Sequence, residues 1–538
     1  MIKDLKLVDS SIECDAQVCI IGAGTSGIFL ARQLRKLGLQ VVMLEAGDSV
    51  ARKSEEIDQH CLQRGMTYNG AESGRSFGLG GTSALWGGQM IPLVPSDFEA
   101  RLESGFEAWP ISYSEVAAYF PFVRQELGLC DGSSLTDTKT NSILQKKFPL
   151  LTGLSDDFDL RLSEWLPFKT RNFSVAFADT LKNDDGLTVW LNAVVIGMHR
   201  SSSVNDPRIE TITAQSSNGR NLLVRPSTVV ICAGALESTR LLLEYDEATE
   251  GSITHSGAPL GRYFSDHLSM TCGRFVCRDW LRYNMAVAPI FERGVMRTPR
   301  LELTKRAQKN QHLPSAFAHF TFVTHGDTGF DVVRSILRKR QGEQHSLNFS
   351  PSLLGRVVSD VSAMAFWRGV YKRLWLPRQA DLLLQVDIEQ IPNPDSRIYL
   401  SDVYDSYKRK RIVIDWKIKE DDLRAIRKVA ELSFASWKNS SLNEIADLQN
   451  TLPDQLDSFS SLYDVYHPTG SLRMGTSAAN SVVDNNLCLW ALKNCYASTT
   501  VVFPSAGSAN PGMTHLALTS RLAEHIAKAF GNSKRLIS

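Results

Sequence analysis

The sequence lacks the usual marks of a secreted, membrane-spanning or nucleic-acid-binding protein. Its nine cysteines are an odd number without a Cys-x-x-Cys pair, which argues against a disulfide framework and against a metal site. No apolar run reaches the roughly 18 residues of a membrane helix, and residues 1–18 lack the basic start and apolar core of a signal peptide. Lys plus Arg (59) nearly equals Asp plus Glu (58), so the chain has no basic excess for nucleic acid. We therefore expect a cytoplasmic protein with no nucleic-acid partner and no metal.

The bulk composition is that of a large globular protein, with one local exception. The 538 residues, 43% hydrophobic and 22% charged, suffice for two or more domains. Residues 334–378 hold nine Arg and Lys against two acids, with apolar and aromatic residues at helical spacing. We interpret about 334–376 as a basic helical insert that packs on its own domain. The alternative is contact with a membrane surface or an anionic substrate.

A complete strand–turn–helix–strand pattern lies near the N-terminus. An apolar strand at 16–21 leads into Gly22-Ala23-Gly24-Thr25-Ser26-Gly27, then a helical pattern at 28–37, and a strand at 41–44 that ends at Glu45. Gly22 permits the tight turn, Gly24 lets the backbone approach a pyrophosphate, and Gly27 allows close packing of helix on strand. Glu45 can accept from a ribose hydroxyl. This order of elements predicts a dinucleotide site.

Two further segments indicate that the dinucleotide domain is discontinuous. Residues 74–88 contain six glycines together with Leu79, Leu85 and Trp86, a composition that suits backbone lying against a planar ligand. Strands are predicted at 187–195 and 228–235, and the second opens a helix at 236–244. The chain would thus return to the nucleotide domain after an excursion, an arrangement typical of flavin enzymes.

A histidine and an asparagine near the C-terminus complete the pattern. His467 and Asn510 each lie in a turn punctuated by glycine and proline. A base beside an amide donor suits removal of a proton from an alcohol and stabilisation of the resulting alkoxide.

These blocks together resemble the glucose–methanol–choline (GMC) family of FAD-dependent oxidoreductases, and within it the pyranose oxidase-like, sugar-oxidising branch. The resemblance implies an α/β FAD-binding Rossmann-like domain interleaved with a substrate domain built on a mainly antiparallel sheet (α+β). We expect the FAD domain at 1–265, with an excursion at about 90–180 that contributes to the substrate side. The substrate domain follows at 266–460, and 461–538 return to the FAD domain with the catalytic pair.

The resemblance also assigns roles to residues. His467 would be the catalytic base and Asn510 its partner on the substrate hydroxyl, with hydride passing to flavin N5. The implied cofactor-binding residues are Gly22, Gly24, Thr25, Ser26, Gly27, Glu45, Arg75, Gly81, Thr82, Ser83, Gly87, Val195, Thr499 and Asn510. Relatives that tether FAD covalently carry a histidine at the position of Leu85, so we expect non-covalent FAD. Thr499 and Gly512-Met513 depart from the family pattern and place the least family-like residues beside the catalytic pair.

The substrate is expected to be a small-molecule alcohol, with a secondary hydroxyl of a sugar or glycoside as the leading hypothesis. A GMC-fold lyase and a non-catalytic FAD-binding protein are the alternatives. Gln385, Glu389 and Gln390 on a strand pattern at 382–390 either line the pocket or face solvent, and His515 has a supporting role in or beside the site. We expect His267 to support domain packing. No motif identifies the electron acceptor.

Overall fold

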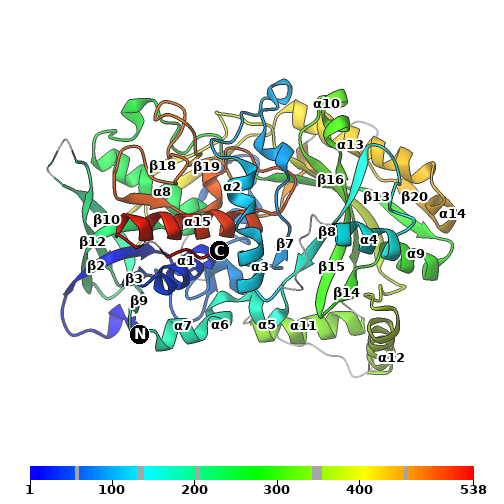
Figure 1. The fold of residues 1–538 in the computed structure, drawn as a ribbon, viewed down its shortest axis with the longest axis horizontal. Helices are drawn as coiled ribbons and strands as arrows, with labels where there is room; N and C mark the ends of the chain where they lie inside the picture. Colours follow the sequence, from blue (N-terminus) through cyan, green and yellow to red (C-terminus); the bar gives the residue numbers. More distant parts are fainter. Residues whose placement is uncertain are drawn as a thin grey trace.

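Two sheets lie side by side and divide the molecule into two regions (Figure 1). The structure is a computed structural model, and it describes residues 1–54, 60–129, 138–201, 203, 206–326, 328–341, 354–452, 459–532 and 534–537. The chain crosses between the two sheets several times. Strands within residues 89–165 join the second sheet, and a strand near the C-terminus pairs with the first.

The first sheet is built around parallel strands that are buried on both faces. Its order is β1-β9-β3-β2-β12-β11-β10, and β22 pairs with the end of β12. The parallel strands are β1 (Ile2–Asp4), β2 (Ile12–Ile21), β3 (Val41–Leu44), β9 (Leu187–Leu191), β12 (Asn221–Ile231) and β22 (Cys495–Ala497). The antiparallel strands β10 (Val194–Arg200) and β11 (Ile209–Gln215) complete it. Near-continuous apolar runs in β2, β3 and β12 suit strands that are covered on both sides.

One predicted strand is wrong in detail, because residues 187–195 form two strands. Asn192 has a φ of +54°, a left-handed conformation that breaks the extended run between β9 and β10. Asparagine tolerates this conformation better than most residues. The break turns the chain so that β9 joins the parallel part of the sheet and β10 the antiparallel part.

The second sheet is antiparallel throughout its described pairings, which confirms the expected fold class. Its order is β20-β13-β17-β16-β15-β8-β7, with β14 on β15 and β21 on β13. The strands are β7 (Gln89–Met90), β8 (Phe158–Trp165), β13 (His267–Cys277), β14 (Ile290–Glu292), β15 (Val295–Leu303), β16 (Ala316–Val323), β17 (Asp381–Glu389), β20 (Ala446–Asn450) and β21 (Tyr463–Asp464). One face packs an apolar core against α13 (Glu420–Lys438). The other face is polar and is described with the site.

Helices and short strands surround the two sheets. On the nucleotide side, α1 (Thr25–Lys36) and α15 (Gly512–Ala529) pack together, and α8 (Gly234–Ala248) follows β12. The remaining α-helices are α2 (Tyr113–Ala117), α3 (Phe120–Glu126), α4 (Thr138–Lys147), α5 (Phe168–Arg171), α6 (Phe173–Ala176), α7 (Ala178–Asn183), α9 (Trp280–Val287), α10 (Lys305–Gln311), α11 (Gly329–Gln341), α12 (Leu354–Phe366) and α14 (Leu442–Ile445). A small sheet joins β5 (Leu62–Gly65), β18 (Arg397–Tyr404) and β19 (Lys410–Trp416), and β4 (Arg52–Lys53) pairs with β6 (Ser76–Phe77).

The basic insert forms α11, α12 and the single turn η9 (Trp367–Tyr371) at one end of the molecule. Residues 342–353 of this insert lie outside the described residues. Among the described helices, none has the length and apolarity needed to cross a membrane.

Candidate active site

One cavity of about 800 Å³ runs between the two sheets. At one end its wall includes Gly22, Gly24 and Glu45 of the nucleotide sheet, and at the other end it includes His467 and Asn510. Both predicted functional regions, which are more than 400 residues apart in the chain, therefore line one cavity.

The first glycine loop joins β2 to α1, and its three glycines do different work. Gly22 has a φ of +103°, and a Cβ there would lie 2.6 Å from the Cys232 carbonyl oxygen. A Cβ at Gly27 would lie 2.0 Å from the Gly22 carbonyl oxygen, so this glycine permits the close turn of helix on strand. At Gly24, by contrast, the nearest atom to a Cβ is 3.9 Å away, in Gly81. Gly24 therefore leaves space that a ligand can fill.

The N-terminus of α1 faces the same space. Thr25 and Ser26 of its first turn line the cavity, and no side chain among the described residues caps the helix. The Ser26 hydroxyl donates to the Ser498 carbonyl at 2.9 Å, which ties α1 to the C-terminal segment. An uncapped helix start with its N–H groups directed at a cavity is suited to a phosphate group.

Glu45 organises both glycine loops. Its carboxylate accepts from the backbone N–H groups of Ala23 (2.8 Å), Gly47 (2.8 Å) and Gly78 (2.9 Å). Burial raises the pKa of Glu45, and these three bonds oppose that shift. The carboxylate thus holds the two loops together at the wall where a ribose would lie.

The second glycine loop mainly forms part of the cavity wall. Arg75, Gly81, Thr82 and Gly87 line the cavity, as does Leu85. Ser83 does not: its hydroxyl donates to the Gly80 carbonyl and accepts from the Phe173 N–H, so it shapes the loop from behind. The expected contact of Ser83 with the cofactor is therefore corrected to a role in loop structure.

Several polar atoms on the cavity wall are buried without a protein partner. Ser76 Oγ, Thr499 Oγ1 and His515 Nε2 have no hydrogen-bond partner among the described residues. Val195 also lines the cavity, and a Cβ added at Gly234, whose φ is +72°, would meet no atom within 4 Å. Buried polar groups are normally paired, so these atoms and the open backbone fit a large ligand with polar groups along its length. FAD meets that description.

The structure brings His467 and Asn510 together at the other end of the cavity. Asn510 Nδ2 lies 3.2 Å from His467 Nε2, and both side chains line the wall. His467 leads into the cavity from a turn in which Asp266 accepts from its backbone N–H at 2.7 Å. The same Asp266 oxygen accepts from the Tyr68 hydroxyl at 2.8 Å, so the turn is anchored to buried structure.

His267 contacts His467 directly and determines which nitrogen of His467 carries the proton. His267 Nε2 lies 2.6 Å from the Gly507 carbonyl oxygen, which only accepts, so Nε2 carries the hydrogen and Nδ1 the lone pair. His467 Nδ1, 3.0 Å from that lone pair, must then be the donor. His467 Nε2 is left as a free base facing Asn510.

Burial keeps both rings neutral. It lowers the pKa of His467 to about 3, with a smaller contribution from His267, and it also lowers the pKa of His267. Ligand atoms of Asp266, His267 and His467 lie within 4.8 Å of one another. The two rings are hydrogen-bonded to each other, and Asp266 accepts from the His467 backbone N–H, so the cluster holds the base in place.

The polar face of the second sheet forms the wall opposite the nucleotide loops. Asp387 and His319 lie on this face with Oδ2 and Nε2 2.7 Å apart. Gln385, on the same strand as Asp387, donates to Ser269 at 2.6 Å. The cavity residues contributed by this sheet are Gln89, Trp165, His267, Phe317, His319, Gln385 and Asp387. Such a wall offers hydrogen bonds and aromatic faces to a polar ligand.

Two expected substrate residues lie behind the wall instead. Glu389 accepts from the Gly507 N–H at 2.7 Å and pairs with Arg101 at 2.7 Å, so it holds the loop whose carbonyl orients His267. Gln390 bonds to the Lys417 carbonyl and accepts from the Trp416 indole. The strand predicted at 382–390 is present as β17, but it ends at Glu389, and residues 386–390 are all buried.

His515 lines the cavity on the side of the first glycine loop. Its ring bonds to the backbone of Ser498, which also accepts from Ser26, and burial lowers its pKa to about 4. This position puts it beside the first turn of α1 and away from the polar sheet face. His267, His319 and Asp387 were not predicted as site residues. The available signal was the two-residue spacing of Phe317 and His319 on β16 and of Gln385 and Asp387 on β17.

Two protein-family models match segments of this chain that line the cavity. Residues 392–519 match the family model for GMC oxidoreductase, and residues 15–63 match a model for an FAD binding domain. The first segment contains His467 and Asn510, and the second contains the first glycine loop and Glu45.

Individual relatives are distant. The chain is 28% identical to 6'''-hydroxyparomomycin C oxidase of Streptomyces lividus over 22% of its length, a match that spans only 24% of that protein. It is 20% identical to 2-methyl-1,2-propanediol dehydrogenase of Mycolicibacterium austroafricanum over 96% of both chains. Pyridoxine 4-oxidase from "Mesorbium loti" shares the fold over 97% of this chain and all of that one, with a TM-score of 0.60 and 16% identity.

Proposed function

We propose that this protein is a GMC oxidoreductase with FAD as its cofactor, and that it oxidises a hydroxyl group of a sugar-like alcohol with His467 as the catalytic base. The observation that carries the proposal is the 3.2 Å pairing of His467 Nε2 with Asn510 Nδ2 at the end of the cavity that begins at the dinucleotide loop. When bound, FAD supplies the two-electron acceptor for hydride from the carbinol carbon.

The chain's own residues handle the proton and the developing charge. The substrate hydroxyl donates to His467 Nε2, which is unprotonated because Nδ1 donates to His267. Asn510 Nδ2–H donates to the hydroxyl oxygen and stabilises the charge that develops as the proton leaves. His467 then becomes an imidazolium held between the substrate and His267, and Asp387 is the nearby carboxylate that favours this charge.

We propose a secondary hydroxyl of a sugar or glycoside as the reacting group. The polar face with Gln385, His319 and Asp387 suits a substrate with several hydroxyl or amino groups, and Trp165 and Phe317 offer faces for a sugar ring. Relatives named 6'''-hydroxyparomomycin C oxidase and paromamine 6'-oxidase support a sugar-like substrate. The match to each spans 24% of that protein.

Anaerobic bleaching of the flavin absorbance tests the proposal. A panel that pairs sugars and glycosides with simple primary alcohols of similar size is added to the holoenzyme without oxygen. Bleaching by a sugar with a free secondary hydroxyl is the expected result. Bleaching by the simple primary alcohols alone contradicts the sugar class. If the protein is yellow but no alcohol bleaches the flavin, alcohol oxidation is contradicted. The remaining functions would then be a lyase or a non-catalytic FAD-binding protein.

Replacing the base gives the sharpest test of mechanism. His467→Ala removes the proton acceptor, and we expect the rate of flavin reduction to fall by about 10²-fold or more, since general base catalysis contributes that much. The measurement is stopped-flow reduction by the best substrate of the panel. His525→Ala, on α15 and outside the cavity wall, is the matched control and should reduce at the parent rate. Equal rates for His467→Ala and the parent would remove His467 from the mechanism.

We also propose that FAD is held without a covalent bond. Leu85 occupies the cavity wall where a tethering histidine would have to lie, and a leucine side chain has no nucleophile. Acid precipitation of the holoenzyme should leave the yellow colour in the supernatant. Flavin that stays with the pellet would contradict this.

A further inference from the structure

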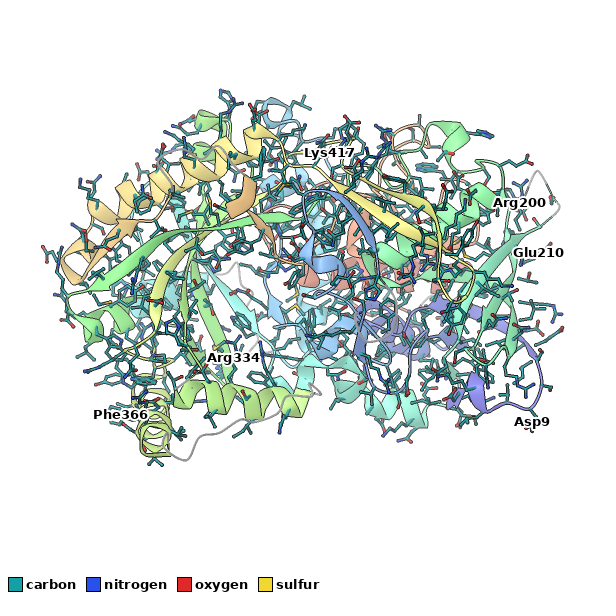
Figure 2. The ribbon with its side chains drawn as sticks, turned by 180° about the vertical axis from the view of Figure 1, so that it is seen from behind. Asp9, Arg200, Glu210, Arg334, Phe366 and Lys417 are labelled. Carbon is teal, nitrogen blue, oxygen red and sulfur yellow. The ribbon has the colours of Figure 1, made fainter. Side chains whose placement is uncertain are left out.

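The end of the molecule that carries α12 and η9 exposes apolar side chains among basic ones. Figure 2 shows Phe366 at the outer edge, at the end opposite Asp9 and Arg200. The exposed fraction is 59% for Val358, 54% for Phe366 and 59% for Val370. Val361 and Tyr371 are also exposed, and the rings of Phe366 and Tyr371 lie 5.8 Å apart. Together these five side chains form the apolar face of α12 and η9.

The opposite side of the same segment is fixed to the protein. Trp367 is buried, and its ring contacts Trp280 of α9 at 5.5 Å. Asp360 is buried and accepts from the Gly329 N–H at the start of α11 at 2.7 Å. The segment therefore does pack on its own domain, as the sequence favoured, but only with one side. Its outer side is presented in a defined orientation.

Every exposed charged side chain on this segment is basic. Arg356, Arg368 and Lys372 are exposed, whereas Asp360, the sole acid between residues 354 and 372, is buried. Arg368 lies over the Phe291 ring at 4.3 Å, which holds its cation close to the protein surface. Lys339 and the partly exposed side chains of α11, which packs against α12, extend the basic surroundings.

We propose that this face binds the surface of an anionic lipid membrane. An amphipathic helix with large apolar side chains and basic neighbours lies in the plane of the headgroups, with its apolar side in the upper acyl region. The uniform positive charge is complementary to anionic headgroups and would repel a basic partner. α12 has 13 residues, too few to span a bilayer, so the contact is peripheral.

Vesicle flotation tests this without reference to the oxidation of any alcohol, so its outcome is independent of the proposed function. The holoenzyme is mixed with vesicles of phosphatidylcholine alone or of phosphatidylcholine with phosphatidylglycerol. We expect flotation with the anionic vesicles only, and its loss as salt is raised. Arg368→Gln with Lys372→Gln should weaken binding by about fivefold for each cation removed.

A second variant and a control separate the apolar contribution from loss of folding. Val358→Ser, Phe366→Ser and Val370→Ser together should abolish flotation while leaving flavin absorbance and Tm unchanged, because all three side chains are exposed. Arg200 lies at the opposite end, and the exposed Leu7 is two residues from Asp9, which also lies there. Leu7→Ser with Arg200→Gln should therefore float like the parent. Flotation that is absent for the parent, or unaffected by both face variants, overturns the proposal. A parent protein that binds no vesicles but forms a dimer, which the same face variants dissociate, also overturns the proposal. A second copy of the chain would then cover the face.

Discussion

At the scale of single residues, the catalytic end depends on which ring nitrogens carry protons. The Gly507 carbonyl fixes the hydrogen of His267 on Nε2, and His267 in turn fixes that of His467 on Nδ1. Glu389 holds the Gly507 N–H and so keeps the carbonyl in place. A chain of three polar contacts thus leaves a lone pair at the atom where the substrate proton must arrive. His267 is a positioning residue in this arrangement.

Substitutions at His267 test that role. In His267→Asn the amide oxygen can take the place of Nδ1 and accept from His467. In His267→Gln the amide reaches the Nε2 position, and His267→Leu offers no polar atom. We expect flavin reduction to fall by roughly tenfold or more for Leu and Gln, and by less for Asn. Equal losses for Asn and Leu, whose side chains have the same branched shape, would show that the ring is needed only for packing.

The pH profile of the parent gives a second readout. Since burial lowers the pKa of His467 to about 3 from an ordinary 6.5, the base stays unprotonated as the pH falls through 6.5. The rate of flavin reduction is therefore expected to stay level across that pH, as measured by stopped flow in the folded range. A fall with an apparent pKa near 6.5 would show that His467 titrates as an exposed histidine.

At the scale of elements, the turn from β2 to α1 separates structural glycines from a ligand-facing one. Gly22 and Gly27 are required by backbone atoms within 3 Å of any added Cβ, whereas Gly24 is open to the cavity. The N-termini of α1 and α8 meet the same space. The N-termini of two helices are therefore directed at the same ligand site.

Alanine at two of these glycines should separate folding from cofactor binding. Gly27→Ala forces a Cβ to within 2.0 Å of a carbonyl oxygen, and we expect the apoprotein to lose about 1–3 kcal/mol in free energy of unfolding. Gly24→Ala meets no protein atom closer than 3.9 Å, so the apoprotein should keep its stability while the Kd for FAD rises about tenfold. Denaturant unfolding and flavin fluorescence titration measure the two effects. A stable, FAD-binding Gly27→Ala variant would contradict this account.

At the scale of the whole molecule, the two sheets exchange segments and share one cavity. β7 and β8 leave the nucleotide region to join the second sheet, and β22 returns from the C-terminal region to pair with β12. Neither sheet is completed by one continuous stretch of chain. The cofactor wall likewise combines residues from both ends of the sequence.

This interleaving predicts how FAD acts on stability. FAD bound to the folded state only should stabilise the protein by about 2.7 kcal/mol at a concentration of about 100 times its Kd. For a cooperative unit of this size that corresponds to a rise in Tm of roughly 2 °C. Because the chain crosses between the two regions several times, we expect one cooperative transition, with loss of secondary structure and release of flavin at the same temperature. Circular dichroism and flavin fluorescence followed together make the comparison. Two separate transitions would show that the regions unfold independently.

The sequence alone determined the local elements and the family. The Gly22–Glu45 pattern is contiguous, so hydrophobic periodicity and glycine spacing were enough to predict β2, α1 and β3, and the GMC resemblance and the fold class are confirmed. The pairing of His467 with Asn510 was also predicted from the family pattern, and the structure places the two together. Local patterns carry such information because short-range geometry depends on neighbouring residues.

Only the tertiary structure decided the contacts between distant segments. The link from Glu389 through Gly507 and His267 to His467 joins residues up to 240 positions apart, and nothing in their spacing indicates which atoms meet. Three other features also could not be predicted from the sequence. They are the left-handed conformation of Asn192, the placement of Glu389 and Gln390 behind the cavity wall, and the exposed side of α12. Each depends on which faces pack against one another, and packing is a property of the folded chain as a whole.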